Sequence, residues 1–197
     1  MNMGGFYLRK SKYSFVLGMI SLVLFFSLTS ALWGKQAQIT DIIVTNNQDQ
    51  LLVYFNTKGC FTPEMNKAIM SGIPTTFTFF LEIDKPRNFW PNKRLSAVKL
   101  HHTIKYDSLR EEFNLTLSER GNQSFIVKEF SKAQEIMADV SNIQLIPLKQ
   151  LERNNQYQLR IKAELNKVTL PLYLHYILFF VSLWDFETDW YVVEFNY

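Results

Sequence analysis

Cysteine is nearly absent from this chain of 197 residues, which contains only Cys60. One cysteine cannot form a disulfide within the chain, and it has no partner for a Cys-rich zinc site. No cysteine follows the apolar run near the N-terminus, which excludes the lipid anchor of a lipoprotein. The sequence around Cys60 also lacks the local pattern of a catalytic nucleophile.

Motifs of the common enzyme classes are missing as well. The sequence contains no GxSxG, no HExxH, no phosphate-binding loop and no dinucleotide fingerprint. We therefore expect no enzymatic activity, no catalytic residue, no metal and no cofactor. If the protein were an enzyme, the best remaining candidates would be His101 and the carboxylates of Glu187 and Asp189.

An excess of positive charge is missing from most of the chain. The net charge of +3 comes from 21 Lys and Arg against 18 Asp and Glu. Arg9, Lys10 and Lys12 account for the whole excess, and residues 1–31 contain no acid. The rest of the chain is neutral, so it lacks the basic patch that nucleic-acid binding requires.

Residues 1–31 have the pattern of an export signal. The three cations precede an apolar stretch over residues 14–28, and small residues follow at Thr29, Ser30 and Ala31. This pattern predicts cleavage after Ala31. The alternative is an uncleaved signal anchor, because extending the apolar stretch to Trp33 gives the ~20 residues that cross a bilayer. In both cases we expect the remainder to be exported.

The exported part, residues 36–197, has no repeat, low-complexity tract or linker, which predicts a single domain. Its apolar residues alternate with polar ones, as in strands with one buried face. The clearest alternation places Val98, Leu100, His102, Ile104 and Tyr106 on one face. We predict strands over residues 39–45, 51–57, 77–83, 95–106, 112–118, 124–129, 157–165 and 190–197, with breaks at 47–50 and 121–122.

Two helices are expected between these strands. Thr62 is placed to cap the first, with Pro63 in its first turn and Gly72 at its end. The second begins at a capping box over residues 131–134 and carries apolar residues at 133, 136, 137 and 140. The fold class is therefore α+β, an antiparallel sheet or sandwich with two or three short helices.

Aromatic residues gather at the C-terminus, where ten of the last 25 residues are Phe, Trp or Tyr. The uncharged stretch over residues 170–184 is shorter than the ~20 residues of a membrane-spanning helix. One interpretation is a buried segment that fills the core. The other is an interface with a membrane or another protein, anchored by Tyr176, Phe179, Phe180 and Trp184.

The polar candidates have ordinary structural explanations. His101 and His102 are adjacent, so on a strand they point to opposite faces and cannot hold one metal together. Glu187 and Asp189 could share a face for acid–base chemistry or cation binding. We favour a turn at the entry to the last strand, in which Asp185, Thr188 and Asp189 bond to nearby backbone amides.

Several segments resemble one family. They are Cys60-Phe-Thr-Pro-Glu64, Ser71-Gly-Ile-Pro-Thr-Thr-Phe-Thr-Phe79, His102-Thr-Ile-Lys-Tyr-Asp107 and Trp184-Asp-Phe-Glu-Thr-Asp-Trp-Tyr191. Together they resemble the bacterial domain-of-unknown-function family 4390 over nearly all of residues 36–197. The resemblance implies a Gram-negative envelope protein without an established activity. It also implies that Gly72, Pro74, Tyr106 and Trp190 serve backbone geometry and packing as readily as function.

These observations lead to one expectation about function and one alternative. We expect a non-enzymatic periplasmic protein-interaction module, either soluble after signal cleavage or anchored to the inner membrane. Its partner would be another envelope protein, and the resemblance suggests a membrane sensor histidine kinase, since family members are often encoded beside one. The alternative is a carrier or sensor of a small apolar ligand or lipid.

Overall fold

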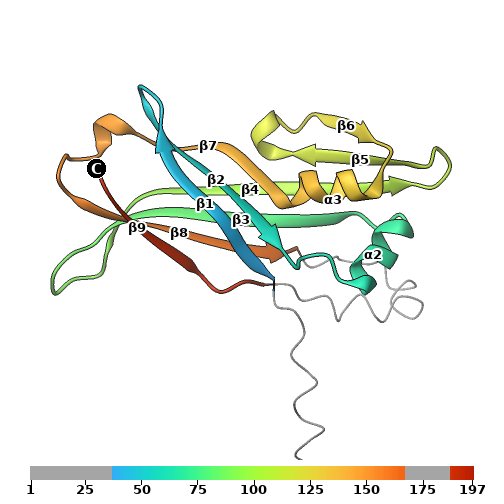
Figure 1. Cartoon of the computed structure of the whole chain (residues 1–197), viewed down its shortest axis with the longest axis horizontal. Helices are drawn as coiled ribbons and strands as arrows, with labels where there is room; N and C mark the ends of the chain where they lie inside the picture. The colour runs from blue at the N-terminus through green and yellow to red at the C-terminus, as the bar shows by residue number, and fades with distance from the viewer. Residues whose placement is uncertain (1–36, 167–186) are drawn as a thin grey trace, which may run out of the picture. The chain divides into compact units, whose positions relative to one another are not determined.

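The computed structural model describes residues 37–166 and 187–197, which belong to one compact unit, Gln36–Tyr197. The described residues of this unit form two antiparallel sheets and two α-helices (Figure 1). The elements follow in the order β1 (Gln38–Asn46), β2 (Gln50–Lys58), α2 (Pro63–Met70), β3 (Thr75–Lys85), β4 (Lys93–Asp107), β5 (Glu112–Leu117), η2 (Ser118–Arg120), β6 (Ser124–Val127), α3 (Phe130–Ala138), β7 (Asp139–Pro147), η3 (Leu148–Gln150), β8 (Gln156–Leu165) and β9 (Tyr191–Asn196). The predicted α+β class is confirmed.

The smaller sheet has the strand order β1-β2-β7. A tight turn joins β1 to β2, in which the side chain of Asn47 accepts hydrogen bonds from the backbone N–H groups of Asp49 and Gln50. Asp41 and Asn142 have φ angles of +56° and +61°, and the pairing register shifts near both residues. These shifts are β-bulges, which add twist to a strand and disrupt its regular hydrogen bonding.

The larger sheet has the strand order β6-β5-β4-β3-β8-β9. β3 lies at its centre, between β4 and β8. The alternation in the sequence predicted the faces of these strands correctly, because Phe77, Phe79 and Ile161 are fully buried. Leu100, Ile104 and Leu159 are buried in the same cluster, and Val98 packs against it half-buried.

The two sheets face each other across this core. Figure 1 shows β1 and β2 crossing in front of the larger sheet, and contacts join β7 to β3 and β4 and β1 to β8. Phe55 of β2 meets Phe79 of β3 edge to face, with ring centroids 5.6 Å apart. α3 contacts β4, β5 and β6 and leads directly into β7, so it extends the smaller layer along the larger sheet.

The first helix begins as predicted. The Thr62 side chain accepts a hydrogen bond from the N–H of Met65 at 3.2 Å, and Pro63 occupies the first turn. Gly72 follows the helix with φ +81°, a conformation that L-residues rarely adopt. A Cβ at this position would lie 3.5 Å from the carbonyl oxygen of Tyr106.

The second helix begins and ends earlier than predicted. Its N-cap is Glu129, without a side-chain hydrogen bond, so the capping box predicted over residues 131–134 is wrong. The helix ends at Ala138, and Val140 lies in β7, a strand that we did not predict. Val140 is fully buried. A buried apolar residue at this position fits both the helical spacing that we used to place it and the strand in which it lies.

None of the helices in these described ranges is long and apolar enough to cross a membrane.

Candidate partner-binding edge

β9 forms one edge of the larger sheet, and the residues just before it contain the last motif of the resemblance. Its pairing with β8 places Tyr191 opposite Ile161 and Phe195 opposite Tyr157. Tyr191, Val193 and Phe195 therefore pack against the core, while Val192 points outward with 51% of its surface exposed. We call the outer surface formed by Arg160, Lys162, Glu187, Trp190 and Val192 the β8–β9 edge.

Thr188 attaches the start of this edge to β8. Its N–H donates to the carbonyl oxygen of Ala163, and its hydroxyl accepts from the N–H of Ala163 at 3.0 Å. Thr188 is buried, and its neighbours Glu187 and Asp189 are exposed. The local turn that we favoured is therefore wrong for Thr188, whose hydroxyl bonds across the sheet.

Trp190 lies beneath two cations of β8. The guanidinium carbon of Arg160 lies 4.5 Å from the centroid of the Trp190 ring, and the Lys162 ammonium nitrogen lies 5.9 Å from it. Both distances are within the range of cation–π attraction. Lys162 also forms an ion pair with Glu187. These contacts hold the indole in place on the outer face of the larger sheet.

Acidic residues of β3 fix Arg160 from the other side. Its Nη1 donates to Glu82 Oε2 at 3.3 Å and to Asp84 Oδ2 at 3.4 Å. Arg94 of β4 contacts the same two carboxylates, at 2.6 Å for Glu82 and 3.7 Å for Asp84. Asp84 is only 3% exposed, so its charge requires these partners. Arg160, which lies over the Trp190 ring, is thus itself held in place by two carboxylates.

The residues considered for catalysis are not brought together. Pairing across the sheet places Glu187 opposite Glu164, Glu164 opposite Thr78, and Thr78 opposite His101. Three strand spacings therefore separate Glu187 from His101, which is about 14 Å. Asp189 lies on the Glu187 side of this separation, two residues further along the same segment.

His101 is occupied by polar neighbours on the outer face. Its Nδ1 lies 3.1 Å from the hydroxyl of Thr78, and its backbone N–H donates to the hydroxyl of Ser118. Partial burial lowers the pKa of His101, and the charges of Lys99 and His102 lower it further. The lowered pKa favours the neutral form of the His101 imidazole.

His102 lies on the inner face, as the alternation predicted, and it is fully buried. Nδ1 lies 3.0 Å from the carbonyl oxygen of Met137, and Nε2 lies 2.9 Å from the Glu119 carboxylate. Burial acts to raise the pKa of Glu119, but the hydrogen bond and charge of His102 lower it more, so the net pKa is below the usual 4.5. This pair joins β4 to η2 and α3.

The predicted interface residues Tyr176, Phe179, Phe180 and Trp184 lie outside the described residues, as does His175. Within the described ranges, no three His, Cys, Asp or Glu side chains are grouped to hold a metal ion. The described chain resumes at Glu187, the first residue of the β8–β9 edge after this segment.

Comparison with known proteins identifies the family. A family described as Domain of unknown function (DUF4390) matches residues 34–194. The chain belongs to this family. The match covers the whole of the smaller sheet and the larger sheet as far as Glu194 in β9. No curated protein and no solved structure matches the chain.

Two residues that the resemblance singled out have structural roles in this DUF4390 domain. Gly72 has a positive φ angle and lies beside the backbone of Tyr106. The Tyr106 ring contacts Phe113, with centroids 4.8 Å apart. Both roles are backbone geometry and packing, which the resemblance left open alongside a functional role.

Sequence reasoning missed the cations over Trp190. Arg160 and Lys162 alternate along a strand that we predicted, so their shared face was evident. Their meeting with Trp190 depends on the pairing of β8 with β9, which no local pattern encodes.

Proposed function

We propose that this exported domain is a non-enzymatic interaction module of the cell envelope that binds another envelope protein. The observation that carries the proposal is that side chains fill the space between the two sheets. Phe77, Phe79, Leu81, Ile83 and Tyr157 are 0% exposed, and all five lie on the inner face of the larger sheet. A carrier needs an enclosed volume of about 300 Å³ or more, and side chains that line such a volume would not be covered by protein atoms on every side, as these five are.

The β8–β9 edge has the properties of a protein-binding surface. Trp and Arg are enriched among the residues that dominate interface energies, and here they are stacked and held in place. In the described residues, β9 pairs only with β8, so its second edge offers backbone N–H and C=O groups to an added strand. The predicted aromatic segment, with Tyr176, Phe179, Phe180 and Trp184, directly precedes this edge in the chain.

The partner that we propose is a membrane sensor histidine kinase. Support comes from the family, whose members are often encoded beside such a kinase, and from the neutral charge of residues 32–197, which offers no clamp for a charged small ligand. The domain would then lie in the periplasm, free or anchored to the inner membrane.

Crosslinking in cells tests the proposal. A photoreactive amino acid at Val192 should crosslink to the kinase, because Val192 is exposed on the edge strand. The same amino acid at Ile126 serves as the control, since Ile126 is similarly exposed, at 55%, on β6 at the opposite edge. Equal crosslinking from both positions, or none from Val192, would contradict the proposal.

A second measurement tests the aromatic segment. Phe180→Asp with Trp184→Asp should abolish recovery of the kinase in a pull-down from membranes, provided that circular dichroism shows a folded variant. A folded variant that keeps its partner would remove this segment from the interface, and an unfolded one would assign it to the core. Copurification of a lipid with the native protein would favour the carrier alternative.

A further inference from the structure

The connection between β3 and β4 carries the most exposed aromatic residues among those that the structure describes. Phe89 is fully exposed, and 74% of the Trp90 surface is exposed. The loop projects from the end of the larger sheet, at the left of Figure 1 (green, between β3 and β4). We call residues 86–92 the β3–β4 tip.

The backbone of the tip is restricted. Pro86 and Pro91 bracket it, and each fixes one φ angle. Phe89 adopts φ +66°, which is rare for a bulky residue and is characteristic of strained functional segments. Asn92 donates to the side chain of Gln158 at 2.9 Å, which ties the base of the tip to β8. The two aromatic side chains are therefore held outward with little freedom to fold back.

Positive charge surrounds the aromatic pair. Residues 85–94 contain Lys85, Arg87, Lys93 and Arg94 and no acid. Lys85 pairs with Glu152, and Arg94 pairs with Glu82. Arg87 and Lys93 form no ion pair with any of the described residues. The tip is thus the one described place where exposed aromatics coincide with a run of cations.

We propose that the β3–β4 tip docks on the surface of an anionic phospholipid bilayer. Trp prefers the interface between headgroups and hydrocarbon, because its ring is apolar and its N–H is polar. Lys and Arg beside it are attracted to anionic headgroups over about a Debye length. This inference goes beyond the proposed function and uses none of its residues, since the β8–β9 edge lies on other strands.

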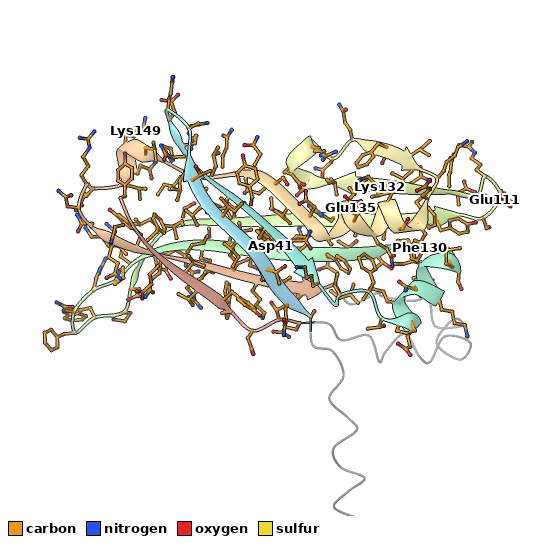
Figure 2. The ribbon with its side chains drawn as sticks, viewed as in Figure 1. Asp41, Glu111, Phe130, Lys132, Glu135 and Lys149 are labelled. Carbon is orange, nitrogen blue, oxygen red and sulfur yellow. The ribbon has the colours of Figure 1, made fainter. Side chains whose placement is uncertain are left out.

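Membrane docking would orient the module. β4 runs from the tip toward the turn at Leu109, about 45 Å away for a strand of this length. Figure 2 labels Glu111 of this turn at the end of the domain opposite to the tip. Leu109 is 95% exposed, so it provides a control that is equally open to solvent, also apolar, and remote from the tip.

The test places a label at each end of the full chain. Asn88→Cys and Leu109→Cys are each modified with an environment-sensitive fluorophore and reconstituted with vesicles that contain a spin-labelled phospholipid as quencher. Native Cys60 does not compete, because burial raises the pKa of its thiol to about 12 and keeps it protonated. One set of vesicles contains phosphatidylglycerol, and the other contains phosphatidylcholine alone.

In the phosphatidylglycerol vesicles, we expect the label at position 88 to be quenched about twofold or more relative to the label at 109, with less difference in phosphatidylcholine or at high salt. Phe89→Ser with Trp90→Ser should remove the difference, and Leu109→Ser should leave the position 88 signal unchanged. Circular dichroism confirms that these surface variants fold.

Three results would overturn the proposal. The first is equal quenching at both positions in phosphatidylglycerol vesicles. The second is quenching that survives the double substitution. The third is protection of position 88 in native membranes but not in pure lipid, which would make the tip a protein contact. Failure of the Val192 crosslink would leave this result unaffected, so the two proposals are tested separately.

Discussion

His102 has a hydrogen-bond acceptor at each ring nitrogen, a carbonyl oxygen at Nδ1 and a carboxylate at Nε2. The ring thus bridges α3 and η2, and its contact with Glu119 lowers the pKa of that carboxyl. The pair lies in the core, where a carboxylate without a partner is costly. The second carboxylate oxygen of Glu119 is buried without a partner in the described residues, so His102 carries most of the compensation.

Replacing His102 tests how much the His102–Glu119 pair contributes to the stability of the fold. His102→Ala should lower the free energy of unfolding by about 3 kcal/mol, because it leaves Glu119 without its partner. His101→Ala is the matched control and should cost about 1 kcal/mol, since that residue is partly exposed and contacts only hydroxyl groups. Urea unfolding measures both. A double-mutant cycle with Glu119→Gln should show coupling of about 1 kcal/mol or more, and additive effects would contradict the ion pair.

The lowered pKa of Glu119 predicts a pH dependence. A carboxyl whose folded pKa is below its unfolded value stabilises the protein above the unfolded value and loses this contribution as pH falls through the folded one. Stability should therefore be maintained above the usual value of 4.5 and decline below it. Glu119→Gln should flatten this decline in urea unfolding measured across the acid range. An unchanged acid profile would show that other carboxylates determine it.

At the scale of elements, the two helices differ in how they begin. α2 uses a threonine side chain as its cap, while α3 begins at Glu129 without one. The sequence predicted a side-chain cap for both. Packing decides for α3, because Phe130 in its first turn stacks on Phe113 with ring centroids 5.1 Å apart. Figure 2 shows Phe130 at the start of α3, with Lys132 and Glu135 following it.

Removing each hydroxyl distinguishes the two starts. Thr62→Ala should destabilise the domain by about 1 kcal/mol through loss of the cap. Ser131→Ala, which the capping-box interpretation would place at a similar cost, should change stability by less than about 0.5 kcal/mol. Thermal unfolding compares the two variants. Equal losses would mean that Ser131 caps α3 after all.

Strand prediction succeeded for the strands of the larger sheet with one buried face and failed for β7 of the smaller sheet. β3, β4 and β8 follow period two, so their buried faces were evident. β7 was missed because Asn142 breaks the alternation and because no turn residue separates the strand from α3. Val140 was assigned to the helix, since its spacing from Ala133 fits both structures. Asparagine adopts positive φ angles more readily than most residues, but it adopts ordinary angles more often, so Asn142 alone did not indicate a bulge.

At the scale of the whole molecule, the two sheets are joined by a core that is filled with side chains. Ile161→Ala should lower the free energy of unfolding by about 2–5 kcal/mol, because the isoleucine side chain is fully buried between the sheets. Val192→Ala on the neighbouring strand should cost less than about 0.5 kcal/mol, since its side chain points to solvent. Chemical denaturation checks both, and comparable losses would mean that the faces of β8 or β9 are assigned wrongly.

Export of the domain from the cytoplasm is a separate prediction. Alkaline phosphatase is active only after export to an oxidising compartment, where its disulfides form. A fusion after Tyr197 should therefore be active, because the basic residues before the apolar run predict export of the rest. The same fusion to residues 32–197 is the control and should be inactive. A stable, inactive fusion to the full chain would contradict export.

Parts of the candidate surfaces could not be predicted because they depend on distant strands. The partner of His102 lies on η2, and the cations over Trp190 lie on β8. The β3–β4 tip is different, because its signal was present in the sequence: two aromatics between two prolines, with cations on both sides and no acid. Such a segment predicts an exposed turn, and the structure adds that nothing in the described domain covers it.

The order of strands in the smaller sheet has a consequence for synthesis. β2 ends at Lys58 and its partner β7 begins at Asp139, so most of the larger sheet is made between them. Because the N-terminus is synthesised first, the β1–β2 hairpin is made before β7. The edge of β2 that will pair with β7 is then unpaired, and the apolar face of the hairpin is uncovered. β3 can likewise pair with β4 soon after both are made, but its other neighbour, β8, is synthesised later. The domain therefore cannot close until its last third has emerged, and during that interval the nascent chain exposes apolar surface and unpaired strand edges that favour aggregation.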